Sequence, residues 1–280
     1  MINLIQRYSK SFLFTFIFCI SFFVISDDVS PNLAITSKDI NLIKNNIDNV
    51  LPAKKELDSL IENNKKYISS SPVVPYPKDA GGGYTHEQHK TNYRLLYENA
   101  LIFQLTKNVS NLLYVQDLFL EYARIYPSLD LHPKQKEQSP GKIFWQSLNE
   151  AMWLFYAIQA YDMVKNSLSV DDKNKIENNL LRPMAIFLSK GQPDTFNKIH
   201  NHGTWASASV GMTGYVLNDK NFVDQALYGL DKSGNAGFLK QLDNLFSPDG
   251  YYEEGPYYQR FALLPFVIFA KAIDSNQPEL

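Results

Sequence analysis

The apolar residues of this chain recur every three or four positions from Ser37 onward and rarely alternate, which is the spacing of helices rather than of strands. Two helices are predicted on either side of Pro52, because proline interrupts a helix interior. The breaker-rich stretch 69–84 predicts a long loop, and no strand pair is predicted anywhere. Further helices are predicted at 86–107, 111–126, 142–165, 171–190, 205–215, 222–230, 237–246 and 257–272.

This succession of helices joined by short polar loops favours an all-α fold, specifically an α/α toroid in the form of an incomplete barrel of helical hairpins. A hydrophobic share of 45% supplies enough apolar surface for one large core. The segment 205–215 carries Ala206, Ala208, Gly211 and Gly214, whose small side chains let neighbouring backbones approach closely. We therefore expect a tightly packed inner helix there.

The first residues have the pattern of an export signal. Arg7 and Lys10 precede an apolar run at 12–25, and polar residues follow it. The run is shorter than the ~20 residues that a membrane-spanning helix needs, so a permanent anchor is only the alternative interpretation. We expect residues 1–26 to be a signal peptide and 27–280 to form one toroid domain. The protein would then be periplasmic or secreted, with no stable membrane span after removal of the signal.

Charge and cysteine content exclude several classes of protein. The formal net charge of −2 argues against a broad nucleic-acid-binding face, although a local cleft can still hold an anion. Cys19 is the only cysteine and lies in the predicted signal, so no disulfide and no cysteine-ligated metal is expected. His86 and His89 lack the four-residue spacing and the nearby carboxylates of a metal site. No metal or cofactor is predicted.

Two segments concentrate groups that can carry chemistry, and the first is 200–205, His-Asn-His-Gly-Thr-Trp. Two imidazoles and an amide crowd together there, in a loop or at a helix start. An alternative reading is structural, because Asn201 can cap the helix through its side-chain oxygen and His202 can pack against Trp205. The pattern alone leaves both interpretations open.

The second segment, 249–260, places four tyrosines in a turn that opens a helix. Pro256 suits the first helical position, which puts Tyr258 in the first turn. The positive end of the helix dipole and the nearby Arg260 would favour a phenolate at that position. The alternative is a wall of exposed tyrosines that binds sugar rings.

Four stretches together resemble the alginate lyase and heparinase II/III-like superfamily, most closely the oligoalginate lyases of polysaccharide lyase family 17. They are Asn-His-Gly-Thr-Trp at 201–205, Leu-Asn-Glu-Ala at 148–151, the stretch 77–86 with Gly-Gly-Gly-Tyr-Thr-His, and Glu-Gly-Pro-Tyr-Tyr-Gln-Arg at 254–260. The resemblance covers most of the chain after the predicted signal. It implies an α/α toroid followed by an antiparallel β-sheet domain, with the active site between the two.

The resemblance also implies residue roles. In such lyases the Asn-His pair and the second tyrosine of the Pro-Tyr-Tyr motif are active-site groups, which correspond here to Asn201, His202 and Tyr258. A further histidine and tyrosine come from the sheet domain, and the sequence to Leu280 contains no strand-rich region. We therefore expect these residues to form one half of an active site.

The implied reaction is β-elimination, in which the proton on C5 of a uronate is removed while the sugar on C4 departs. Asn201 would neutralise the uronate carboxylate as it becomes an enolate, and Tyr258 would serve as base, acid or both. His202 would be a second base or would hold the carboxylate. The residues expected to grip the substrate are Arg260, Gln146, Asn149, Tyr84, His86 and Tyr257, although polar residues such as Gln146 and Asn149 on one helix face are often simply solvated.

The expected partner is therefore an acidic polysaccharide or oligosaccharide, and the leading hypothesis is a lyase that cleaves alginate or oligoalginate and leaves unsaturated uronate ends. A heparinase-type lyase acting on sulfated glycosaminoglycans is the first alternative. A polysaccharide-binding protein without catalytic activity is the second. The sequence does not determine internal against terminal cleavage, uronate preference or oligomeric state.

Overall fold

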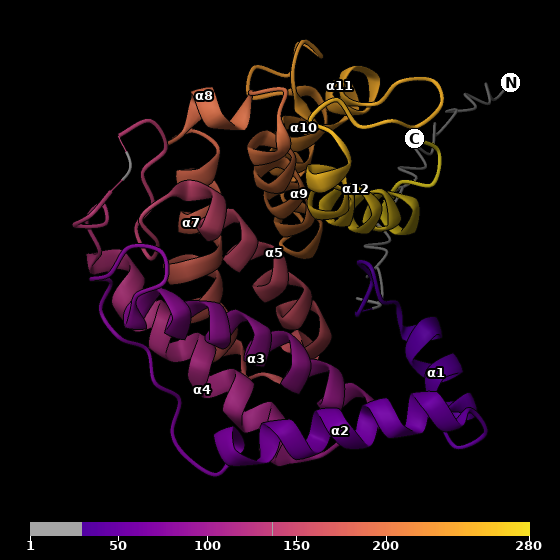
Figure 1. Ribbon diagram of the computed structural model, residues 1–280. Helices are drawn as coiled ribbons and strands as arrows, with labels where there is room; N and C mark the ends of the chain where they lie inside the picture. Colours follow the sequence, from indigo (N-terminus) through magenta and orange to yellow (C-terminus); the bar gives the residue numbers. More distant parts are fainter. Residues whose placement is uncertain (1–29, 136) are drawn as a thin grey trace, which may run out of the picture.

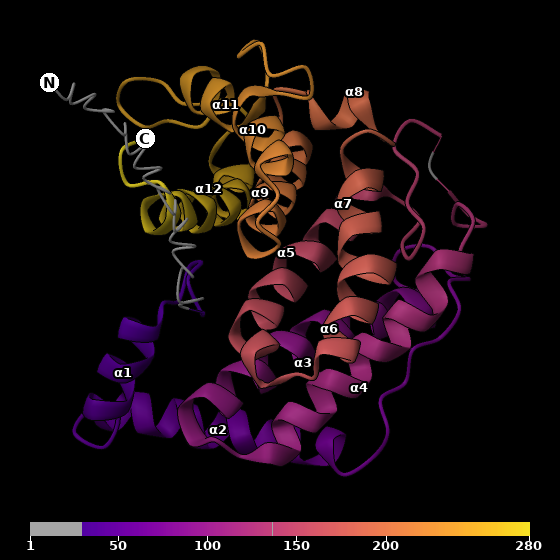
Figure 2. The ribbon, with the colours of Figure 1, turned by 180° about the vertical axis from the view of Figure 1, so that it is seen from behind.

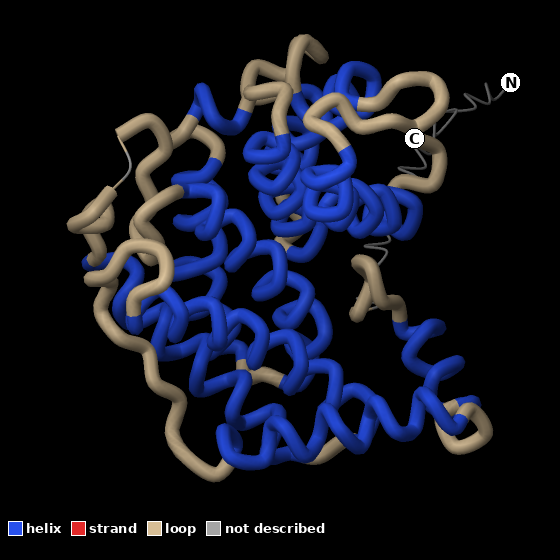
Figure 3. The backbone as a smooth tube through the Cα atoms, viewed as in Figure 1, coloured by secondary structure: helices blue, strands red, loops and turns tan. Residues whose placement is uncertain are grey.

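The computed structural model describes residues 30–135 and 137–280, so the predicted signal peptide at 1–26 lies outside the described residues. The described part contains helices and no strands (Figure 3), which confirms the all-α prediction. None of its helices is long and apolar enough to cross a membrane. The α-helices are α1 (Ser37–Asn46), α2 (Leu51–Ile68), α3 (Tyr84–Thr106), α4 (Val109–Ile125), α5 (Ser147–Val164), α6 (Val170–Ile176), α7 (Arg182–Leu188), α8 (Pro193–Phe196), α9 (Asn201–Val216), α10 (Lys220–Tyr228), α11 (Gly237–Leu245) and α12 (Pro256–Asn276).

The helices follow an open arc from α1 and α2 through α3 and α5 to α9 and α12 (Figure 1). Within this arc α3 packs on α5, α5 on α9, and α9 on α12, which makes one continuous inner row. Outer helices support the row, with α4 against α3, α7 against α5 and α9, and α10 against α9. Seen from behind, α4, α6 and α7 lie in front of the inner row (Figure 2).

The segment 30–36 ties together two helices of the inner row. The buried carboxylate of Asp162 on α5 accepts the backbone N–H groups of Asn32 at 2.7 Å and Leu33 at 3.1 Å. On its other side the segment meets the end of α12, where Asn276 donates to the carbonyl of Asn32 at 2.8 Å. Residues more than 200 positions apart in the chain are therefore joined by side-chain hydrogen bonds.

The prediction of a tightly packed inner helix is confirmed at α9, which contacts α5, α10 and α12 and is almost entirely buried. A Cβ added at Gly211 would overlap the ring of Phe269 on α12. One added at Gly214 would lie 2.7 Å from the side chain of Val223 on α10. The two glycines therefore set how closely α9 approaches its neighbours.

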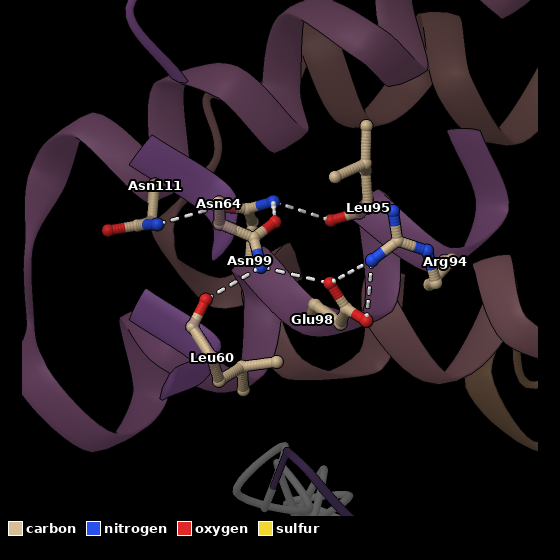
Figure 4. A network of polar contacts seen from close by, with 7 residues as sticks. All are labelled: Leu60, Asn64, Arg94, Leu95, Glu98, Asn99 and Asn111. Atoms are coloured by element: carbon tan, nitrogen blue, oxygen red, sulfur yellow. Dashed lines mark hydrogen bonds and ion pairs between the residues drawn. The ribbon is translucent and has the colours of Figure 1, made fainter. Parts of the chain in front are cut away.

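The first three long helices are joined by buried asparagines (Figure 4). Asn99 on α3 donates to the side-chain oxygen of Asn64 on α2 at 2.8 Å and accepts from Asn111 on α4 at 2.7 Å. Asn64 in turn donates to Glu98, which also pairs with Arg94 at 2.8 Å. A buried amide costs little when it is hydrogen-bonded, so this network fixes the register of the three helices rather than weakening the core.

Two predicted helices have different bounds in the structure. The helix expected at 142–165 begins at Ser147, because the backbone N–H groups of Lys142 and Ile143 bond to the side chain of Glu150 instead of continuing the helix. The helix expected at 171–190 is divided into α6, a wider π-helical turn at Glu177–Leu181, and α7. Pro183 explains that division, since it has no N–H to donate and disturbs the preceding turn.

Buried histidines make the core sensitive to acid. Tyr122 accepts from Asn92 at 2.9 Å, which leaves the tyrosine hydrogen to bond the Nδ1 atom of His89 at 2.8 Å. Burial, with a smaller contribution from neighbouring His86 and His132, lowers the pKa of His89 to about 3. The folded protein therefore keeps this imidazole neutral at a pH where the unfolded chain binds a proton.

Because the pKa of His89 is lower in the folded state than in the unfolded state, stability should fall as the pH drops below about 6.5. Between about pH 7.5 and about pH 5 the free energy of unfolding should decrease by about 2 kcal/mol on account of this residue. Denaturant titrations at both pH values would measure the loss. His89→Gln keeps an acceptor for Tyr122 but does not titrate, so an equal loss in that variant would contradict the assignment.

Candidate active site

One cavity gathers the beginnings of three inner helices. It has a volume of about 730 Å³, within the range of ordinary ligand sites. The first turns of α5, α9 and α12 all contribute to it, so three positive helix-dipole ends meet around the same space. The lining residues are Leu148, His200, Asn201, His202, Glu254, Tyr257, Tyr258, Arg260 and Phe261.

The start of α9 answers one part of the question about the His-Asn-His segment, namely whether Asn201 caps the helix. His200 occupies the N-cap position, and its Nδ1 atom accepts from the backbone N–H of His202 at 3.3 Å. Asn201 and His202 are the first two helical residues, and Asn201 does not serve as the cap. The rings of His200 and His202 meet edge to face with centroids 5.1 Å apart. The asparagine side chain is thereby left for another partner.

That partner is Glu254, a residue within the second motif that the sequence analysis did not select. Its carboxylate accepts the backbone N–H of Asn201 at 3.0 Å and the side-chain Nδ2 of the same residue at 2.6 Å. Tyr252 donates its hydroxyl at 2.7 Å, and the Nε2 atom of His200 lies 3.4 Å away. The only available sequence signal was its place in the motif, because nothing local predicts a partner 53 positions earlier.

The charge states of this cluster follow from its contacts. Burial alone would raise the pKa of Glu254, but hydrogen bonds from Tyr252 and Asn201 and the proximity of His200 outweigh it and hold this pKa below its ordinary value. Burial lowers the pKa of His200, which keeps the imidazole neutral at pH 7 despite the adjacent carboxylate. Burial and the same carboxylate raise the pKa of Tyr252. The cluster therefore carries one negative charge surrounded by neutral donors.

The turn before α12 places Glu254 and the tyrosines. Gly250 and Gly255 adopt φ angles of 84° and 87°, a region that favours glycine, and they bracket a turn in which Glu253 donates its backbone N–H to Leu245 at 2.9 Å. Pro256 begins α12, as predicted, so Tyr258 lies in the first helical turn. Its side chain is 46% exposed and lines the cavity.

Arg260 interacts with a different tyrosine from the one expected. Its guanidinium lies over the ring of Tyr257, 4.9 Å from the centroid, and not over Tyr258. The rings of Tyr257 and Tyr258 meet edge to face with centroids 5.4 Å apart. Both Tyr257 and Arg260 line the cavity, so the cation and two aromatic rings form one exposed wall beside the Asn201 cluster.

Four other predicted substrate residues do not line the cavity. Gln146 precedes α5 instead of sharing a helix face with Asn149, although its side chain donates to Asn149 at 3.1 Å. Tyr84 begins α3 and is exposed to solvent. His86 is buried edge-on against Phe144, with ring centroids 5.1 Å apart. Gln146 lies in the loop that leads to Leu148, and His86 contacts that loop through Phe144.

A second buried carboxylate holds that loop. Glu150, from the Leu-Asn-Glu-Ala motif, accepts the backbone N–H groups of Lys142 at 2.6 Å and Ile143 at 3.0 Å and the hydroxyl of Tyr126 at 3.0 Å. Burial raises its pKa. The motif therefore positions the start of α5 and contributes only Leu148 to the cavity.

Metal binding has little support in the described residues. Among residues 30–135 and 137–280, no group of three or more histidine, cysteine, aspartate or glutamate side chains is arranged to hold a metal ion. His86, His89 and His132 are close enough to influence one another's pKa, but they lie in the core away from the cavity lining. The chemistry available at the cavity is that of amide, imidazole, phenol, guanidinium and carboxylate groups.

A cavity walled by tyrosines at the starts of three inner helices fits a carbohydrate-active protein, and the comparisons specify the family. Residues 44–280 match the family model described as Alginate lyase. An “Exo-oligoalginate lyase” of Saccharophagus degradans is 53% identical over 255 residues, which are 91% of this chain and 35% of that protein. An “Alginate lyase” of Stenotrophomonas maltophilia is 51% identical over 215 residues, 77% of this chain and 29% of that protein. The chain belongs to the alginate lyase family, and it spans about a third of the length of the curated relatives it matches.

A substitution at Gly203 tests whether the start of α9 tolerates a side chain there. A Cβ there would overlap the carbonyl oxygen of Lys198, a backbone atom that cannot move independently. Gly203→Ala should lower the free energy of unfolding by about 1–3 kcal/mol and displace Asn201. Gly81→Ala is the matched control, because its Cβ would lie 3.5 Å from Trp145 in ordinary contact. Equal denaturation midpoints for the two variants would contradict this account.

Proposed function

We propose that this chain supplies the helical half of an active site that cleaves alginate or oligoalginate by β-elimination at the 4-O-glycosidic bond. The observation that carries the proposal is the meeting of Asn201, His202 and Tyr258 around one cavity in a member of the alginate lyase family. The relatives' names support alginate as the substrate class. Since the chain covers about a third of those proteins, elimination by the chain itself is part of the proposal.

The C5 proton is only weakly acidic, and its removal is the difficult step of the reaction. Its removal places charge on the adjacent carboxylate, and one preorganised donor to that charge is worth about 3 kcal/mol. Asn201 is the donor in this proposal, supported by its place at the positive end of α9. The phenol of Tyr258, partly exposed in the cavity, transfers the proton, and His202 assists as base or as a second contact to the carboxylate.

The cation-bearing wall supports an anionic sugar chain as ligand. Arg260 over Tyr257 offers a positive charge beside an exposed aromatic face, which suits a uronate that has both a carboxylate and apolar ring faces. Its flat guanidinium can donate two parallel hydrogen bonds to a carboxylate. Few other cations lie at the cavity, which favours carboxylated alginate over the more highly charged sulfated glycosaminoglycans.

The decisive assay is the appearance of unsaturated uronate ends, which absorb ultraviolet light, when the protein is incubated with alginate. Tyr258→Phe should reduce their rate of formation at least about 100-fold, because a general acid or base contributes about 10²- to 10⁴-fold. Tyr251→Phe alters an exposed tyrosine of the same turn that does not line the cavity, so it should keep most of the rate. Normal turnover by Tyr258→Phe would overturn the assignment.

The same assay run over a panel of polymers distinguishes the alternatives. Cleavage of heparan sulfate with alginate left intact would replace the proposal with a heparinase-type lyase. Binding of alginate without any unsaturated product would make the chain a polysaccharide-binding module. Equilibrium binding measured on the same samples separates these two outcomes.

We also propose that the protein is exported to the periplasm or beyond, on the strength of the basic and apolar pattern at 1–26. Mass spectrometry of protein recovered from a cell fraction outside the cytoplasm should find a new N-terminus near residue 27. Replacement of the apolar residues at 12–25 by polar ones should leave the uncleaved chain in the cytoplasm. Recovery of the intact chain from membranes would favour a permanent anchor instead.

A further inference from the structure

Glu254 raises a physical question, because a carboxylate in the wall of a cavity for an acidic sugar repels its ligand. The cluster around it carries no compensating cation, since His200 is held neutral. Because its negative charge does not favour binding of an acidic ligand, we looked for a structural role of Glu254. Its contacts indicate what that is.

The hydrogen bonds that this carboxylate accepts come from Asn201 and Tyr252. The Oε1 atom accepts from the backbone N–H of Asn201 and from the hydroxyl of Tyr252, at 3.0 Å and 2.7 Å. The Oε2 atom accepts from the Asn201 side chain at 2.6 Å and lies 3.4 Å from the Nε2 atom of His200. Because the Nδ1 atom of His200 already accepts from His202, its Nε2 atom carries the ring hydrogen of the neutral imidazole.

An ionised carboxylate has no hydrogen of its own and accepts at both oxygens, so it meets all three of these donors at once. A glutamine in the same place would direct its NH₂ group at a hydrogen of Asn201 in either orientation of its amide, since each carboxylate oxygen receives one N–H of that residue. The carboxylate also decides how Asn201 lies, because a flipped amide would bring two oxygens together. One Nδ2 hydrogen is thereby committed to Glu254, and the second remains for a substrate group.

We infer that Glu254 is a positioning residue, which holds the Asn201 amide in the single orientation that donates to the uronate carboxylate as it becomes an enolate. The inference rests on the proposed function and adds a residue to it. Glu254 acts through Asn201 and does not itself touch the reacting atoms. Glu254 also lies beside His200, whose ring accepts the backbone N–H of His202 at the start of α9.

The kinetic test separates an effect on KM from an effect on kcat. Removal of a negative charge by Glu254→Gln should leave KM for alginate unchanged or lower it, whereas misorientation of Asn201 should reduce kcat by about 10- to 100-fold. Glu254→Asp keeps the charge but loses the reach, so its kcat should also fall. Glu253→Gln removes an exposed neighbouring charge and should leave kcat unchanged. A fall in kcat/KM that comes from KM alone would overturn the inference.

A double-mutant cycle tests whether the effect passes through Asn201. If it does, Asn201→Ala combined with Glu254→Gln should have the same kcat as Asn201→Ala alone. Effects that multiply would mean that Glu254 acts independently, and would overturn the positioning role. Denaturation midpoints of the single variants separate this outcome from a general loss of folded protein.

Nuclear magnetic resonance of the Asn201 side chain tests the inference without an activity assay. In nitrogen-15-labelled protein, the Asn201 side-chain amide should show one shifted, slowly exchanging hydrogen that Glu254→Gln abolishes and Tyr258→Phe leaves in place. An unchanged Asn201 signal in Glu254→Gln would overturn the positioning role even if the protein is an active lyase. Absence of unsaturated ends from the unaltered protein, with this signal behaving as expected, would remove the proposed function and leave the orientation of Asn201 established.

Discussion

Buried or half-buried carboxylates that accept backbone N–H groups from other segments hold this molecule in shape. Asp162 binds the segment 30–36, Glu150 binds the loop before α5, and Glu254 binds the start of α9. Each oxygen can accept two hydrogen bonds, so one side chain organises several backbone groups that no helix or sheet would satisfy. A buried carboxylate that lost these partners would be costly in free energy, so the hydrogen bonds of each carboxylate are expected to form together.

These anchors matter because the cavity is built from helix starts. The first turns of α5, α9 and α12 come from segments far apart in the chain, and each must be held at its N-terminal end if their dipoles are to meet. These positive helix ends and Arg260 oppose the negative charge of Glu254 at the cavity, in a chain whose formal charge is −2. In the proposed function, the helix starts and Arg260 would attract an anionic sugar, rather than a cluster of lysines and arginines.

The outcome of the sequence predictions differs from residue to residue for identifiable reasons. Pro256 predicted where α12 begins, because its backbone preference is local. The helix expected from residue 142 began at Ser147 because the Glu150 carboxylate captures the intervening N–H groups. Four residues that were expected at the substrate lie outside the cavity lining, namely Gln146, Asn149, Tyr84 and His86. A motif identifies important residues but does not say whether they support the fold or contact a ligand.

The sequence alone predicts that the chain is helical, where most helices lie and which family it resembles, because periodicity, proline positions and motif residues are local features. The partners of two site residues depend on the tertiary structure: Asn201 donates to Glu254 instead of capping α9, and Arg260 lies over Tyr257 instead of Tyr258. The physical reason is that a side chain with several possible partners takes the one that folding brings within hydrogen-bonding distance. For Asn201 that partner is 53 residues away, beyond the reach of any local pattern.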